Sequence, residues 1–143
     1  MIKLCAPPVA VLAVWFGAAS GPALGAEAAV QSRPAQVEVL AGGKVKRIVL
    51  SRDAADRLGI ELDEVRTDPG GRLIVPYSSV LYDLAGNTWI YVSMDQLSFV
   101  REPVRIDVIR GEDAFLQEGP ARGTKILALG VPEVYGTEIG VGH

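Results

Sequence analysis

The sequence is poor in the side chains that most catalytic and metal sites require. Its 143 residues include one cysteine, Cys5, and one histidine, His143, at opposite ends of the chain. A mature protein that has lost Cys5 has no disulfide to form, so a packed core must supply its stability. Met94 and His143 are too few donors for a metal site of three or four ligands. We therefore expect neither a bound metal nor any other cofactor.

Groups for nucleophilic or acid-base catalysis are also scarce. Ser78 and Ser79 are adjacent, but no histidine precedes His143 and no Ser-x-x-Lys pattern surrounds them. A serine without a nearby base is a poor nucleophile at neutral pH. The carboxylate pairs at 63–64 and 112–113 lie next to turns or point to opposite faces of a strand, which is typical of solvated surface charge. The chain is predicted not to be an enzyme.

Clustered positive charge is missing as well. Without Lys3 the chain holds 13 basic and 17 acidic residues, and both kinds are spread along it rather than gathered in blocks. Nucleic-acid binding needs Lys and Arg concentrated on one face. We expect no nucleic-acid partner.

The first residues have the order of a secretory signal peptide. Lys3 precedes an apolar run over residues 9–16, and small residues then lead to Ala26. The run falls short of the roughly 20 residues that a spanning helix needs. Residues 1–26 are therefore predicted to be a cleaved signal for the bacterial periplasm. A second small-x-small site at 26–28 and an uncleaved inner-membrane anchor remain alternatives.

The remaining 117 residues are enough for one domain. Residues 27–35 have no periodicity and are predicted to be a flexible leader. We expect a single folded domain over residues 36–138 and a frayed C-terminus over residues 139–143.

The first folded segments carry clear local signals. A Gly-Gly pair at 42–43 separates two apolar-rich runs, which indicates a hairpin over residues 36–50. Ser51 and Asp53 favour a helix start and Gly59 a left-handed exit, so the pattern predicts a short helix near residues 51–58.

Short strands separated by turns fill the rest of the chain. The cluster Asp68-Pro69-Gly70-Gly71 indicates a reversal after a weak strand at 60–65. The later strands are expected at residues 72–76, 80–82, 88–92, 97–101, 104–108, 114–117 and 124–129. Strands at spacings of about 8 to 12 residues predict an all-β, mainly antiparallel domain, a small roll or barrel-like body with one short α-helix.

Several segments together resemble one known family. They occur in the same order as in the membrane-proximal domain of periplasmic adaptor subunits, the membrane fusion proteins of resistance-nodulation-division efflux pumps. The matching segments are Val75-Pro76-Tyr77-Ser78-Ser79-Val80-Leu81-Tyr82-Asp83, Gly86-Asn87-Thr88-Trp89-Ile90-Tyr91-Val92, Phe99-Val100-Arg101-Glu102-Pro103-Val104, Gly119-Pro120-Ala121-Arg122-Gly123-Thr124-Lys125-Ile126 and the ending Gly130 to Glu138. Residues 50–60 are similar to a segment near the start of the folded part of family members.

The parts that separate these segments in the family are missing here. The lipoyl-like domain, the α-helical hairpin that meets the outer-membrane channel and most of the central β-barrel have no counterpart between Val65 and Val75. By resemblance, the membrane-proximal domain rests on the inner-membrane pump. The resemblance therefore implies a non-catalytic module that contacts an inner-membrane transporter or a full-length adaptor subunit, and that reaches the membrane through these partners rather than through a spanning helix.

An aromatic and charged surface is the candidate contact site. Trp89 and Tyr91 fall on one face of their strand, and Tyr82 lies nearby in sequence. Exposed aromatics beside Arg101 and Glu102 are typical of protein-contact surfaces, whereas rings that cover the core are the alternative.

A second function is compatible with the same sequence. A free-standing periplasmic domain that binds a small ligand or stabilises an envelope assembly would share only ancestry with the efflux adaptors.

Overall fold

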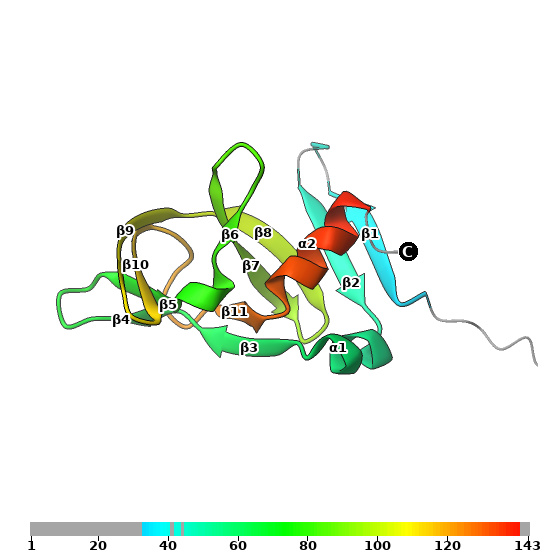
Figure 1. Cartoon of the computed structure of the whole chain (residues 1–143), viewed down its shortest axis with the longest axis horizontal. Helices are drawn as coiled ribbons and strands as arrows, with labels where there is room; N and C mark the ends of the chain where they lie inside the picture. The colour runs from blue at the N-terminus through cyan, green and yellow to red at the C-terminus, as the bar shows by residue number, and fades with distance from the viewer. Residues whose placement is uncertain (1–32, 41, 44, 141–143) are drawn as a thin grey trace, which may run out of the picture. The chain divides into compact units, whose positions relative to one another are not determined.

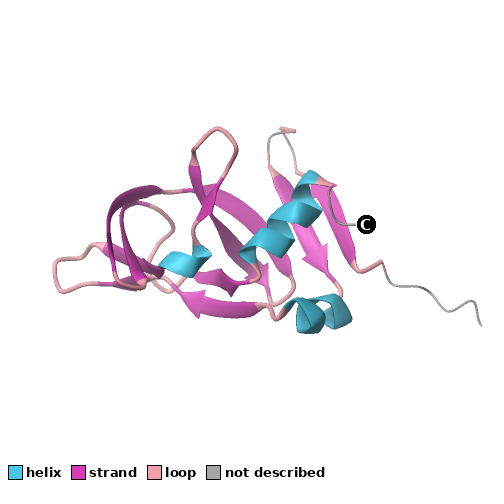
Figure 2. Ribbon diagram, viewed as in Figure 1, coloured by secondary structure: helices cyan, strands magenta, loops and turns pink. Residues whose placement is uncertain are grey.

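Two antiparallel sheets and two α-helices build the described part of the chain (Figure 1 and Figure 2), which a computed structural model gives for residues 33–40, 42–43 and 45–140. The first sheet contains β1 (Ala35–Val39), β2 (Lys46–Leu50), β3 (Glu61–Glu64), β6 (Leu81–Tyr82), β7 (Thr88–Asp95), β8 (Ser98–Pro103) and β11 (Lys125–Leu129). The second contains β4 (Arg66–Thr67), β5 (Leu73–Pro76), β9 (Arg105–Arg110) and β10 (Asp113–Glu118). The helices are α1 (Arg52–Leu58), α2 (Val131–Ile139) and the short 3-10 helix η1 (Tyr77–Ser79).

Strand pairing joins the two halves of the chain that the reversal after β4 separates. The first sheet has the order β1-β2-β8-β7-β11-β3 with β6 added to β7, and the second has the order β4-β5-β10-β9. β2 pairs with β8 and β3 pairs with β11, so segments on both sides of the reversal share one sheet. The antiparallel all-β prediction is confirmed. Within the described residues neither sheet closes on itself, so the barrel-like part of the prediction is corrected to open sheets.

Two hydrophobic clusters lie on opposite faces of the first sheet. Along β7 the side chains alternate: Tyr91 belongs to the cluster that the helices cover, whereas Ile90 and Val92 belong to the cluster between the sheets. Phe99 also packs on the helix side, where it is fully buried. Because both faces of β7 are covered, the strand has almost no solvent-facing side at its centre.

Local signals explain the predicted hairpin and helix. β1 and β2 pair from Ala35 with Leu50 to Val39 with Lys46, and Gly42 and Gly43 have positive φ angles between the two strands. The Ser51 hydroxyl accepts the Ala54 amide hydrogen at 3.2 Å, which caps α1. Gly59 ends the helix in the left-handed conformation. The hairpin and α1 are confirmed within a residue of their expected bounds.

Helix α2 corrects the prediction that only one short helix is present. The sequence predicts no helix or strand of its own for residues 130–138, which belong to the expected folded domain. Val131 and Val134 are instead buried against the first sheet, and α2 contacts β1 and β2. Ile139, the first residue of the predicted frayed end, is the last residue of α2.

Some predictions fall on residues that the structure does not describe. The signal peptide over residues 1–26 and the leader up to residue 32 lie outside the described ranges, as do residues 141–143. All described residues belong to a single unit of contacts. Within them, no helix is long and apolar enough to cross a membrane.

Candidate protein-contact surface

The hairpin formed by β6 and β7 carries a tightly bonded loop over residues 83–87. Asp83 organises it, because its carboxylate accepts the backbone N–H groups of Ala85 and Asn87 at 2.9 Å each and the Asn87 side-chain amide at 2.9 Å. The indole Nε1 of Trp89 donates to the same carboxylate at 2.9 Å. Gly86 supplies the positive φ that the turn requires. Four hydrogen bonds to one carboxylate therefore restrain the loop.

These donors also change the acidity of Asp83. The side-chain hydrogen bond from Asn87, followed by that from Trp89, lowers the pKa of Asp83 from 3.8 to about 2. A carboxylate whose folded pKa is lowered stabilises the fold above its unfolded pKa, and that contribution is lost as the pH falls through the folded value. The stabilising contribution of Asp83 is therefore complete above its unfolded pKa and is lost as the pH falls toward about 2.

A carboxyl-carbon NMR titration checks the state of Asp83. We expect a midpoint of about 2 in the wild-type protein and a higher midpoint in the Asn87→Ala variant, because that substitution removes the largest cause of the shift. A wild-type midpoint in the ordinary aspartate range, near 3.9, would contradict the bonding pattern described for the loop.

The loop presents apolar surface to solvent. Leu84 is 98% exposed at its tip, and Tyr82 at its base is 48% exposed. Figure 1 shows this loop extending away from both sheets. Tyr77 in η1 is also exposed. Partial burial, followed by the interaction with the Tyr77 hydroxyl, raises the pKa of Tyr82. The hairpin thus offers Leu84 and Tyr82 to solvent, and the neighbouring η1 adds Tyr77.

Arg101 on β8 packs against the hairpin through Trp89. The Arg101 guanidinium stacks on the Trp89 ring with 4.7 Å between Cζ and the ring centroid. The same guanidinium pairs with the buried carboxylate of Glu138, with 3.2 Å between Nε and Oε1. The Arg101 side chain is 22% exposed, so its charge is largely neutralised inside the protein.

Glu138 connects α2 to the sheet beneath it. Its Oε2 accepts the Tyr91 hydroxyl at 2.6 Å, and its backbone carbonyl accepts Lys46 Nζ at 2.9 Å. Burial, followed by the hydrogen bond to Glu138, raises the pKa of Tyr91 above its ordinary value. A positive side chain at the C-terminus of a helix is favourable because the helix dipole is negative there. Lys46 and Arg101 together compensate a glutamate at the unfavourable end of α2.

The five residues predicted to form the contact surface have different positions. Tyr82 and Glu102 are exposed, whereas Trp89 and Arg101 are half-buried and touch each other. Tyr91 has no exposed area, so it forms no part of the surface. Its hydroxyl instead donates to the buried Glu138 carboxylate.

Three important residues were missed by sequence reasoning. Leu84 had a usable signal, because a leucine inside the turn sequence Asp83-Leu84-Ala85-Gly86-Asn87 has no strand face through which to reach the core. Asp83 belongs to the same turn and is a common loop-bonding residue. Nothing in the residues around Glu138 predicts that it is buried, because its side-chain partners Tyr91 and Arg101 lie on the distant strands β7 and β8.

The two serines that could have been nucleophiles occupy ordinary structural positions. The Ser79 hydroxyl donates to the Pro76 carbonyl at 2.6 Å, and Ser78 is exposed. Between residues 33 and 140, positions 41 and 44 apart, no three His, Cys, Asp or Glu side chains gather closely enough to hold a metal ion. Comparison with protein-family models, with curated proteins and with solved structures finds no match to this chain.

Proposed function

We propose that this chain is a non-catalytic periplasmic module that binds an inner-membrane efflux transporter, or that transporter's full-length adaptor subunit, through the β6–β7 hairpin. The observation that carries the proposal is Leu84, an almost fully exposed leucine on a loop that Asp83 holds rigid. A preordered apolar anchor loses little conformational entropy on binding, which favours protein association.

The resemblance to efflux adaptors supports the choice of partner. The segments 75–83 and 86–92, which resemble the adaptor family, contain η1, β6 and most of β7, so they include strand residues of the hairpin on both sides of Leu84. Tyr82 at the base of the loop and Tyr77 in η1 add exposed aromatic area, and Glu102 adds an exposed charge on β8. An apolar anchor with aromatic and charged neighbours is the usual composition of a binding patch.

Site-specific photo-cross-linking tests this proposal. A photoreactive residue at position 84 is expected to capture an inner-membrane transporter or adaptor subunit, identified by mass spectrometry, in intact cells. The matched control is position 94, because Met94 is also exposed, at 60%, but lies on β7 away from the loop. Leu84→Ser should lower recovery of the same partner about tenfold, which corresponds to about 1.4 kcal/mol, whereas Met94→Ser should not. Equal yields from both positions, or no transport subunit from position 84, would refute it.

A further inference from the structure

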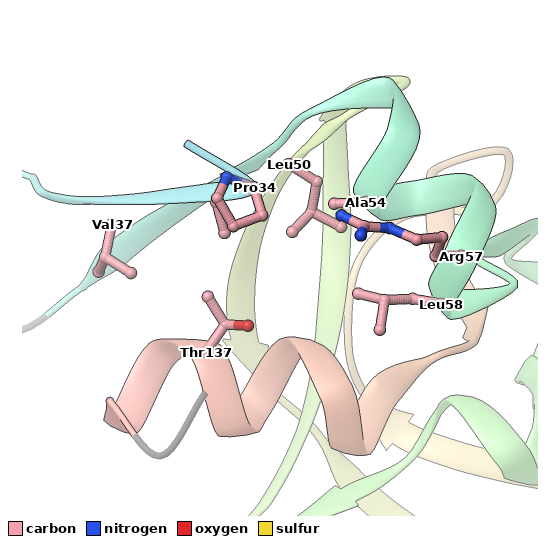
Figure 3. A pocket seen from close by; sticks show the side chains of 8 residues that line it. Pro34, Val37, Leu50, Ala54, Arg57, Leu58 and Thr137 are labelled. Carbon is pink, nitrogen blue, oxygen red and sulfur yellow. The ribbon is translucent and has the colours of Figure 1, made fainter. Parts of the chain in front are cut away.

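An open groove lies between the β1–β2 hairpin, α1 and α2 (Figure 3). Its volume is about 370 Å³, within the range of about 300–1,000 Å³ that is common for small-molecule sites. It is formed by residues other than those of the β6–β7 hairpin. The lining residues are Pro34, Ala35, Val37, Leu50, Ala54, Arg57, Leu58 and Thr137.

Most of the lining is apolar. Leu50 and Ala54 are buried at the inner wall, and Val37, which is 40% exposed, leaves an apolar side chain at the opening. Leu58 comes from the last turn of α1 and Thr137 from α2, so both helices contribute walls together with the β1–β2 hairpin. A linear alkyl chain would remove this surface from water without burying any polar group of its own.

Arg57 is the one charged residue among those that line the groove. Its Nε donates to the Asp53 backbone carbonyl at 3.2 Å, which fixes the base of the guanidinium on α1. Figure 3 shows the guanidinium directed along the helix toward Ala54 and Leu50. In the described part of the chain, no carboxylate oxygen lies within 4.0 Å of an Arg57 side-chain nitrogen. Its outer N–H donors are therefore available to a ligand.

We propose that the groove binds a single-chain carboxylate amphiphile, a medium-chain fatty acid, with its alkyl chain against Leu50 and Leu58 and its carboxylate on Arg57. Charge complementarity selects this ligand: Arg57 is the one charged residue in the lining, and a guanidinium fork matches a carboxylate geometrically. The groove shares no residue with the β6–β7 hairpin. An experiment can therefore refute fatty-acid binding without refuting the proposed efflux partner, and the reverse.

Calorimetric titration of the folded protein with decanoate, below its micellar range, tests the site. We expect saturable binding of one decanoate per chain. Arg57→Gln should weaken it about tenfold, and Arg57→Lys should restore part of the loss. The matched control is Arg52→Gln, because Arg52 is exposed on the same helix but does not line the groove. Decanol should bind more weakly than decanoate and should respond little to Arg57→Gln.

A groove-filling variant separates this site from unspecific association. Val37→Phe places a larger ring on an exposed strand position at the opening and should abolish decanoate binding while the unfolding transition stays unchanged. Decanoate binding that survives both Arg57→Gln and Val37→Phe would locate the amphiphile elsewhere and overturn the proposal. Absence of saturable binding to the wild-type protein would overturn the proposal equally.

Discussion

Replacing Glu138 with alanine is expected to lower the free energy of unfolding by about 3 kcal/mol, the lower end of the range for breaking a buried ion pair. The substitution leaves Arg101 without its carboxylate and the buried Tyr91 hydroxyl without its acceptor. Unpaired buried polar groups lose their hydrogen bonds to water without any replacement. Arg101 keeps 22% of its side chain in solvent and its contact with Trp89, which limits the cost.

Urea unfolding measures this effect as a lower midpoint with an unchanged slope. Glu133→Ala is the matched control, because Glu133 is exposed in the first turn of the same helix and its loss removes only a favourable dipole interaction of under about 1 kcal/mol. Glu138→Gln should cost less than Glu138→Ala because a side-chain carbonyl still accepts the Tyr91 hydroxyl. A Glu138→Ala cost equal to that of Glu133→Ala would show that the pair with Arg101 contributes nothing.

The pair also predicts how a double substitution behaves. Replacing Glu138 and Arg101 together with leucine and methionine removes both charges, so no unpaired ion remains. The double variant should therefore be more stable than the sum of the two single changes suggests. A strictly additive result would mean that the two side chains do not interact in solution.

Secondary structure was predictable wherever the signal was local. Ser51 and Gly59 bracket α1 because a hydroxyl and a left-handed glycine satisfy helix ends within a few residues of sequence. Glycines at 42–43, 71 and 86 mark three of the turns by their positive φ angles. Each of these features depends on neighbours in the chain and on nothing distant.

Helix α2 was missed because its local composition opposes a helix. Gly136 lies inside it, at a cost of about 1 kcal/mol relative to alanine. Burial of Val131 and Val134 against the first sheet outweighs that cost. The spacing of these two valines and Glu138 on one helical face, with Pro132 near the start, was a readable signal.

Strand partners and the buried polar cluster were beyond local reasoning. Alternation along a strand identifies its two faces but does not say which distant strand it joins, so the pairings of β2 with β8 and β3 with β11 could not be derived. The shared face of Trp89 and Tyr91 was predictable from alternation alone. Their separation into a half-buried ring and a fully buried one depends on α2, which carries Glu138 over Tyr91.

Substituting alanine for Gly130 is expected to cost about 2–3 kcal/mol, because two penalties act at this position. Gly130 precedes α2 with φ of +89°, where an L-residue pays about 1–2 kcal/mol. An added methyl group would also overlap the Cδ1 atom of Ile60, a side chain that packs against the helix-side core cluster. Ile60 can relieve the overlap only by leaving part of its packing, which adds about 1 kcal/mol.

The glycine at the other end of α2 separates the two penalties. Gly140 has φ of +81° but nothing within 4 Å of an added methyl group, so Gly140→Ala measures the backbone strain alone. Denaturant unfolding should rank Gly130→Ala as the more destabilising change by about 1 kcal/mol. Combining Gly130→Ala with Ile60→Val shortens the obstructing side chain, so the pair should be less destabilising than the sum of its members. Equal effects at both glycines would mean that Ile60 does not limit the entry into α2.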